Sequence, residues 1–89
     1  MQVAWLNETP EASVVLVGHS DGVGGLDGNI ALSRQRAQSV AERLVSAHSV
    51  PRGQLRAEGV GYLAPVASNA PPEGRALNRR VEALFVNPG

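Results

Sequence analysis

The chain has 89 residues, of which 43% are hydrophobic, with one Trp, one Tyr and one Phe. A chain of this length forms a single domain, and its small core must be built from Val, Leu and Ala. Eight basic residues balance eight acidic ones, so nucleic acid is an unexpected partner. The sequence has no cysteine and two histidines, and we expect no disulfide, metal site or cofactor.

The first half of the chain predicts a helix end, a strand and a glycine loop. Residues 1–7 are typical of the end of a helix, with Pro10 close behind to stop it. The segment Ser13–Val17 contains the continuous apolar run Val14–Val17, which predicts a strand buried on both faces. Residues 21–28 contain four glycines and two aspartates, a composition typical of a loop whose backbone can approach a ligand closely. No run is long enough to insert into a membrane.

From about Asn29 the hydrophobic period is that of a helix, which Pro51 and Gly53 end. The apolar stripe of this helix comprises Ile30, Ser33, Ala37, Val40, Ala41, Leu44 and His48. Asn29 and Arg36 are seven residues apart, so they project within about 20° of each other beside this stripe. Because helical side chains lean toward the N-terminus, we expect Arg36 to reach toward the glycine loop and Asp21. A carboxylate and a guanidinium in one cleft suit a zwitterion.

The second half of the chain predicts two more strands separated by a loop. Residues 54–62 alternate as a strand broken by Gly59 and Gly61, residues 64–72 form a proline-rich loop, and residues 80–86 alternate again. The order of elements predicts an α/β fold with a small mixed sheet, in one domain over residues 1–89.

Three clusters in this order resemble the OmpA-like C-terminal domain, the periplasmic module that holds Gram-negative envelope proteins to peptidoglycan. They are Gly-His-Ser-Asp at residues 18–21, the segment 29–37 with Leu-Ser-Arg-Gln-Arg-Ala, and the segment 74–82 with Asn-Arg-Arg-Val-Glu. The resemblance implies a β-α-β-α-β-β fold with helices on one face, of which this chain lacks the first strand and most of the first helix. It implies a periplasmic location on an envelope parent protein. Because the missing elements would leave a sheet edge open, we expect the chain either to pair with another copy through that edge or face, or to be a fragment whose missing N-terminal portion covers it.

The resemblance also implies a ligand, the diaminopimelate residue of the peptidoglycan stem peptide. Asp21 would bind its ammonium and Arg36 its carboxylate, an assignment that agrees with the charge-assisted hydrogen bonds that these side chains make. The other implied ligand contacts are the Asn29 side chain, Arg79 beside the cleft, and the backbone N–H groups of Ser20 and Gly22.

Each of these residues also has an ordinary structural interpretation. Asp21 and Gly22 can form a simple turn, and Arg36 can pair with a surface acid. Arg79 can belong to the solvated end of an edge strand, and His19 is expected to be packed or hydrogen-bonded at a strand end. An interaction or oligomerisation module without a small-ligand site therefore stays open.

The segment Gly18–Gly22 also matches the Gly-x-Ser-x-Gly nucleophile elbow of serine hydrolases. That motif needs a helix directly after the serine, whereas glycines follow Ser20 here. His19 and Asp21 are the immediate neighbours of the serine, and neighbours in an extended chain point to opposite faces, so neither can reach Ser20 to complete a triad. The other histidine, His48, lies far along the helix. The sequence therefore predicts a protein that is not an enzyme.

Overall fold

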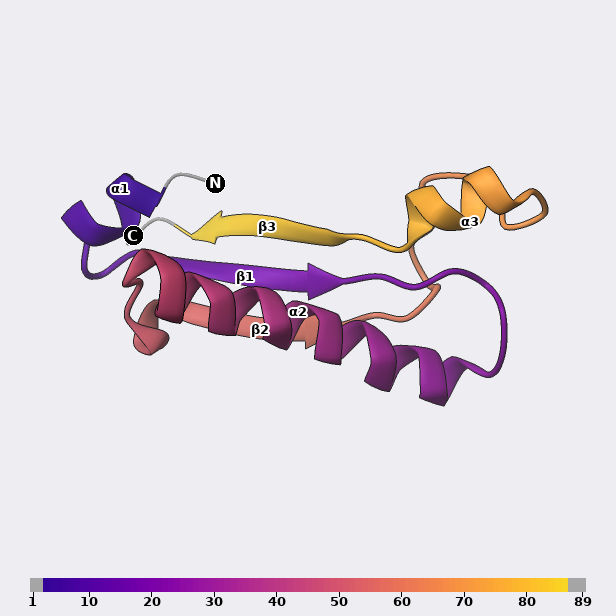
Figure 1. Cartoon of the computed structure of the whole chain (residues 1–89), viewed down its shortest axis with the longest axis horizontal. Helices are drawn as coiled ribbons and strands as arrows, with labels where there is room; N and C mark the ends of the chain where they lie inside the picture. The colour runs from indigo at the N-terminus through magenta and orange to yellow at the C-terminus, as the bar shows by residue number, and fades with distance from the viewer. Residues whose placement is uncertain (1–2, 87–89) are drawn as a thin grey trace.

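The computed structural model describes residues 3–86, which form a three-stranded sheet with one long helix across one face (Figure 1). The strands are β1 (Ser13–Gly18), β2 (Leu55–Gly59) and β3 (Val81–Val86), in the order β2-β1-β3. β2 pairs with β1 in parallel and β3 pairs with β1 antiparallel. The predicted small mixed α/β sheet is confirmed.

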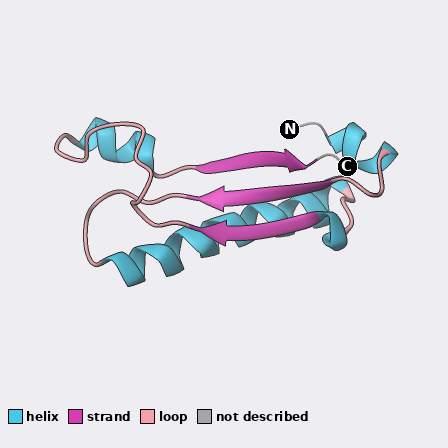
Figure 2. Ribbon diagram, turned by 180° about the vertical axis from the view of Figure 1, so that it is seen from behind, coloured by secondary structure: helices cyan, strands magenta, loops and turns pink. Residues whose placement is uncertain are grey.

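Within residues 3–86, three α-helices pack along one face and at the ends of the sheet (Figure 1). α2 (Leu26–His48) runs along one face, and Figure 2 shows the strands in front of it when the molecule is viewed from behind. α1 (Val3–Glu8) and α3 (Pro72–Asn78) lie at opposite ends of the sheet (Figure 1). The helix end predicted over residues 1–7 is confirmed from Val3 onward, and residues 1–2 lie outside the described part of the chain.

The core lies between α2 and one face of the sheet. Val14 and Leu16 of β1 are fully buried on this face, where Leu16 has Ala57 and Ala83 as its strand neighbours. The buried core residues are Leu6, Val14, Leu16, Ala37, Leu44 and Val50. The prediction that β1 is buried on both faces is wrong, because its alternate residues are only half-buried on the face that α2 does not cover.

α2 begins three residues earlier than predicted, at Leu26, after an extended Gly25. Its C-terminal residue His48 is exposed, so the prediction that His48 belongs to the buried stripe is wrong. After His48, Ser49 adopts a left-handed conformation with φ 58°, and the N–H of the buried Val50 donates to the carbonyl of Leu44 at 3.1 Å. The N–H of Ser49 donates to the same carbonyl, and this wrapping of the last turn is typical of a helix C-terminus.

The largest error of the sequence-based prediction is that it contains no helix at α3. This helix falls where the predicted loop of residues 64–72 meets the cluster at residues 74–82. Pro72 occupies the first turn of this helix, where a missing N–H costs nothing. Seven residues that include a glycine are too few for the hydrophobic period to show. β2 stops at Gly59, where the break was predicted, and β3 starts at Val81, one residue later than predicted.

Two glycines let α2 lie directly on the backbone of the strands. A Cβ atom on Gly18 would lie 1.8 Å from the carbonyl oxygen of Ser33, and one on Gly59 would lie 2.6 Å from that of Ile30. The Ser33 hydroxyl oxygen also accepts a hydrogen bond from the N–H of Gly61 at 3.0 Å. The N-terminal half of α2 is therefore fixed against the ends of β1 and β2, where the glycine loop begins.

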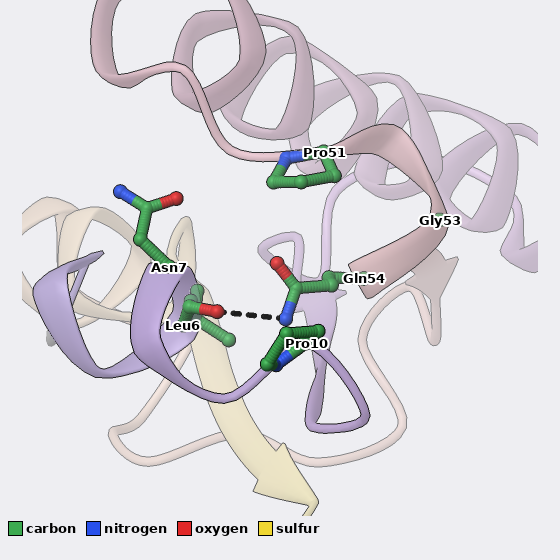
Figure 3. A pocket seen from close by; sticks show the side chains of 6 residues that line it. All are labelled: Leu6, Asn7, Pro10, Pro51, Gly53 and Gln54. Atoms are coloured by element: carbon green, nitrogen blue, oxygen red, sulfur yellow. Dashed lines mark hydrogen bonds between the residues drawn. The ribbon is translucent and has the colours of Figure 1, made fainter.

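At the other end of the sheet, the buried side chain of Gln54 holds α1 in place (Figure 3). Its Nε2 lies 2.8 Å from the carbonyl oxygens of Leu6 and Thr9 and 3.1 Å from that of Ala12. A pocket of about 360 Å³ opens beside it, between α1 and the short 3₁₀ turn Arg52–Gln54. Satisfying three carbonyls with one amide ties the N-terminal segment to the sheet.

We expect Gly18→Ala to destabilise the fold by about 1–3 kcal/mol or more, since the new methyl group would overlap helix backbone that cannot move aside cheaply. The measurement is the free energy of unfolding in urea. Gly28→Ala is the matched control, because a Cβ there meets nothing within 4 Å and the substitution should stabilise α2 by roughly 0.5–1 kcal/mol. Equal effects of the two substitutions would contradict the close packing of α2.

Candidate functional site

The candidate site lies at the end of β1, where the chain enters the glycine loop. The N–H of His19 donates to the carbonyl of Arg80 at 2.8 Å, and the N–H of Ser20 donates to that of Gly61 at 2.9 Å. These bonds extend the pairing of β1 toward β3 on one side and β2 on the other. Asp21 therefore follows a segment that is anchored on both sides.

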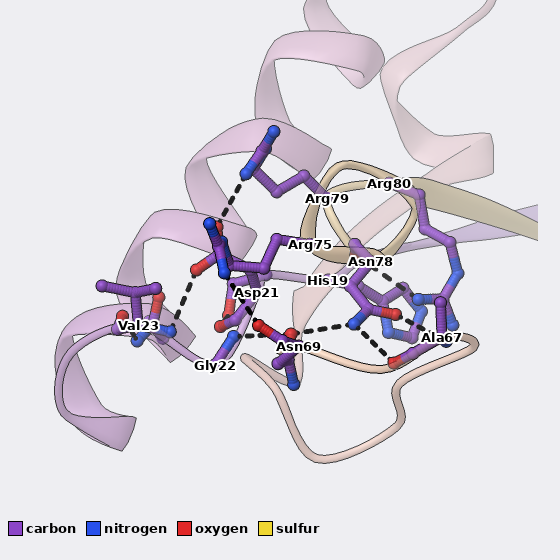
Figure 4. Close-up of polar contacts among 12 residues, drawn as sticks. His19, Asp21, Gly22, Val23, Ala67, Asn69, Arg75, Asn78, Arg79 and Arg80 are labelled. Atoms are coloured by element: carbon purple, nitrogen blue, oxygen red, sulfur yellow. Dashed lines mark hydrogen bonds and ion pairs between the residues drawn. The ribbon is translucent and has the colours of Figure 1, made fainter. Parts of the chain in front are cut away.

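Asp21 uses both of its carboxylate oxygens in the described structure (Figure 4). Oδ1 accepts a hydrogen bond from the N–H of Val23 at 3.1 Å, and Oδ2 accepts one from Nη1 of Arg79 at 2.8 Å. The Arg79 hydrogen bond, followed by that of Val23, lowers the pKa of Asp21 below its usual value. Asp21 is therefore ionised at neutral pH, with a guanidinium as its partner.

Arg36 lies half-buried on α2, with Nη1 donating to the carbonyl oxygen of His19 at 3.2 Å. This bond places its guanidinium against the segment that leads into Asp21. No acidic side chain of residues 3–86 forms an ion pair with Arg36, and Asp21 pairs with Arg79 instead. The alternative in which Arg36 pairs with a surface acid is thus not seen among residues 3–86.

The other predicted contacts hold the loop together. The buried Asn29 side chain donates from Nδ2 to the carbonyls of Val23 and Gly25, at 2.8 and 2.9 Å. The N–H of Gly22 donates to Oδ1 of Asn69 at 2.9 Å. The N–H of Ser20 donates to the carbonyl of Gly61, just beyond the end of β2. The expectation that Ser20 and Gly22 offer free N–H groups is therefore wrong, because the loop itself uses these donors.

Two asparagines that the sequence did not single out connect α3 to the glycine loop (Figure 4). The fully buried Asn78 accepts from the N–H groups of Val66 and Ala67 at 2.8 and 3.0 Å, and donates to Oδ1 of Asn69 at 2.9 Å. The same oxygen of Asn69 accepts the N–H of Gly22. Asn78 belongs to the third sequence cluster, which is the only signal that could have drawn attention to it.

Arg75 is a further cation of the site that the sequence left without a role. Its Nη1 donates to the carbonyl oxygens of Asn69 and Ala70, at 3.0 and 2.8 Å. These two bonds fix the guanidinium, and its charge contributes to the lowered pKa of Asp21. The carboxylate therefore lies in the field of both Arg79 and Arg75.

His19 lies beneath the site as a packed, hydrogen-bonded residue, as predicted. It is buried, and its Nε2 lies 3.0 Å from Oε1 of Glu82, which also pairs with Arg80 at 2.6 Å. Burial and then the charge of Arg80 lower the pKa of His19, against the opposing effect of Glu82. The neutral imidazole is therefore favoured in the folded protein.

A model of the OmpA family matches residues 2–79. The chain belongs to the OmpA family. The Probable lipoprotein YiaD of Escherichia coli is 46% identical to it over 77 residues, which cover 86% of this chain and 35% of YiaD. The Peptidoglycan-binding protein ArfA of Mycobacterium tuberculosis is 48% identical over 79 residues, which cover 89% of this chain and 24% of ArfA. This OmpA-family chain thus spans about a third or less of either relative.

Solved structures agree with this assignment. The peptidoglycan-associated lipoprotein from Burkholderia pseudomallei superposes with a TM-score of 0.84 at 28% identity, over 94% of this chain and 70% of that one. The cell wall anchor of the T6SS from Pseudomonas aeruginosa superposes with a TM-score of 0.71 at 40% identity, over 91% of this chain and 58% of that one.

No helix within residues 3–86 is long and apolar enough to cross a membrane.

We expect Arg79→Gln to raise the pKa of Asp21 toward its ordinary value, because the largest cause of the lowered pKa is the Arg79 hydrogen bond. The measurement is a carboxyl-carbon NMR titration of the Asp21 side chain. Arg43→Gln removes an equal charge from an exposed position of α2 and should leave this titration unchanged. An unaltered midpoint in Arg79→Gln would contradict the ion pair.

We expect His19 to make the protein less stable in mild acid. Its pKa is lowered on folding, so the unfolded chain binds more protons as the pH falls through about 6.5 and below, and stability falls with it. The measurement is the melting temperature at pH 7.5 and 5.5. In His19→Gln the decrease between these pH values should be smaller, while His48→Gln should reproduce the wild-type decrease. Equal decreases in all three proteins would rule out this role for His19.

Proposed function

We propose that this domain holds its parent protein to peptidoglycan without a covalent bond, by binding the diaminopimelate residue of a stem peptide between the glycine loop and α2. The observation that carries the proposal is that two adjacent segments carry opposite charges that are not paired with each other. Asp21 is an ionised carboxylate on the loop, and Arg36 is a guanidinium on α2 without an acidic partner in residues 3–86.

The chemistry of these two groups suits the zwitterionic end of diaminopimelate. Asp21 accepts hydrogen bonds from an ammonium, and Arg36 donates two parallel bonds to a carboxylate, each strengthened by charge. Lysine at position 36 would be a point charge without this two-pronged geometry. Both charged groups are therefore needed, and a peptidoglycan with lysine in place of diaminopimelate offers no carboxylate to Arg36.

In this proposal the remaining predicted residues shape the cleft or border it. Asn29 fixes the loop through the carbonyls of Val23 and Gly25, and Gly22 does so through Asn69. Ser20 is buried and joins the loop to the end of β2. Their substitution would alter ligand binding by moving Asp21.

The names of the relatives support the proposal and its setting. ArfA is named a peptidoglycan-binding protein, and the structural neighbours include a peptidoglycan-associated lipoprotein and a cell wall anchor. We infer a periplasmic location for this domain as part of an envelope protein. Anchoring requires no catalysis, which agrees with the expectation that the protein is not an enzyme.

The serine hydrolase alternative gains no support from the contacts. The Ser20 hydroxyl donates to the carbonyl of Asp21 at 3.0 Å, and the His19 ring pairs with Glu82. Within residues 3–86 no hydrogen bond joins Ser20 to a histidine, and α2 begins only at Leu26. Activation of a serine needs an adjacent base, so the Gly-x-Ser-x-Gly match marks a loop start in this fold.

Self-association through an open sheet edge stays a prediction. β3 is an outer strand of the described sheet, and its Leu84, Phe85 and Val86 side chains are exposed. Unpaired edge strands are the usual sites of strand addition. A module that only mediates such contacts, without a ligand site, is the second candidate function, and ligand binding separates it from the first.

We expect Asp21→Ala and Arg36→Ala each to weaken binding to purified sacculi by roughly tenfold or more, since each removes one of two charged contacts. The melting temperature should change little, because Asp21 forms a surface ion pair and such pairs add little stability. The measurement is co-sedimentation with sacculi containing diaminopimelate, with and without a competing diaminopimelate peptide.

Arg43→Ala and Asp27→Asn are the matched controls, because both residues are exposed on α2 and each substitution removes one charge. They should bind sacculi as the wild type does. Retained binding by Arg36→Ala would overturn the assignment of this site. Loss of binding in both controls as well would show that the losses in Asp21→Ala and Arg36→Ala are not specific to the cleft.

A further inference from the structure

The charges at the site do not balance. Three guanidinium groups, those of Arg36, Arg75 and Arg79, surround the segment that carries Asp21. Within residues 3–86, Asp21 is the one acidic side chain that is hydrogen-bonded or ion-paired to any of them. The free site therefore has an excess of two positive charges. A ligand with one ammonium and one carboxylate would leave that excess unchanged.

Both carboxylate oxygens of Asp21 already accept hydrogen bonds within the protein, so an ammonium would have to displace a donor. Its Oδ1 is held by the N–H of Val23 and its Oδ2 by Arg79. Of the ion pair, the Arg79 side chain is 42% exposed and the Asp21 side chain 17%. Arg79 is thus the partner on the solvent side, the one that can turn away when another cation takes its place.

Arg75 is held differently from Arg79. Its guanidinium is fixed by the carbonyls of Asn69 and Ala70, and Figure 4 shows it beside Asp21 and Arg79. The charges of both Arg75 and Arg79 act on Asp21, so once an ammonium replaces Arg79 at Asp21, neither guanidinium group has a carboxylate partner within residues 3–86. Such a pair of cations favours an anion strongly.

We propose that ligand binding exchanges the partner of Asp21, and that the released Arg79, next to Arg75, binds a second carboxylate of the same stem peptide. This inference rests on the proposed function and adds a specificity to it. The preferred ligand carries one free ammonium and two free carboxylates, one on diaminopimelate for Arg36 and one on a neighbouring residue for Arg79. Stem peptides whose second carboxylate is amidated bind more weakly.

The test combines one substitution with three synthetic peptides. Each peptide is N-acetyl-L-alanyl-γ-D-glutamyl-diaminopimelyl-D-alanine, so that its one free ammonium is that of diaminopimelate. One peptide has all carboxylates free, one has the glutamate α-carboxylate amidated, and one has the C-terminal carboxylate amidated. Dissociation constants are measured by calorimetry for the wild type and Arg79→Gln. We expect Arg79→Gln to weaken binding of the free peptide by roughly fivefold or more, and to have no such effect on one of the two amidated peptides.

The amidated peptide that loses its sensitivity to Arg79→Gln identifies the second carboxylate. Arg43→Gln is the control of equal charge and should affect all three peptides alike. The same fold-change in Arg79→Gln for all three peptides, or none for any, would overturn the second-carboxylate site.

The same measurements distinguish a failure of this inference from a failure of the proposed function. If Asp21→Ala and Arg36→Ala abolish binding of the free peptide while Arg79→Gln acts alike on all peptides, the proposed function stands and this inference fails. If none of the three peptides binds to the wild type, both fail. Melting temperatures of the variants show whether each is folded.

Discussion

The contact on which the rest of the structure depends is the one between the backbone of α2 at Ser33 and the glycines that end β1 and β2. Without side chains at Gly18 and Gly59, the helix lies on the strands themselves, and the Ser33 hydroxyl group holds Gly61. This contact fixes the start of α2 relative to the ends of two strands. The glycine loop joins the end of β1 to the start of α2, so this contact also fixes the distance that the loop spans and the position of Asp21.

Polar side chains at this end of the sheet are used to give the loop a shape. Asn29 holds two loop carbonyls, and the Asn78–Asn69 pair holds the N–H of Gly22 from the other side. A loop rich in glycine loses much conformational entropy when it is ordered, so these bonds offset a real cost. An ordered loop in the free protein avoids that cost at binding, which is how preorganisation raises affinity.

Sequence reasoning succeeded where a pattern has a long period or several independent signals. The strand Ser13–Val17, the stripe through Ser33, Ala37 and Leu44, and the three clusters were recognisable for that reason. It failed where the period is too short or says nothing of burial: α3 has too few residues to show a period, and the period that places His48 on the stripe does not show that this last residue of α2 is exposed. The pairing of Asp21 with Arg79 joins residues 58 positions apart, so no local pattern could predict it.

The ion pair between Asp21 and Arg79 also explains how a largely buried carboxylate keeps its charge. A carboxylate without a partner near buried groups would lose hydration and raise its pKa, whereas Arg79 and the N–H of Val23 keep Asp21 charged. Because the pair is partly exposed, its attraction is screened by water and salt, and another cation can replace Arg79 at small cost. An exposed partner therefore combines two properties that a buried one could not: it keeps the carboxylate charged, and it permits the exchange of cations that we propose.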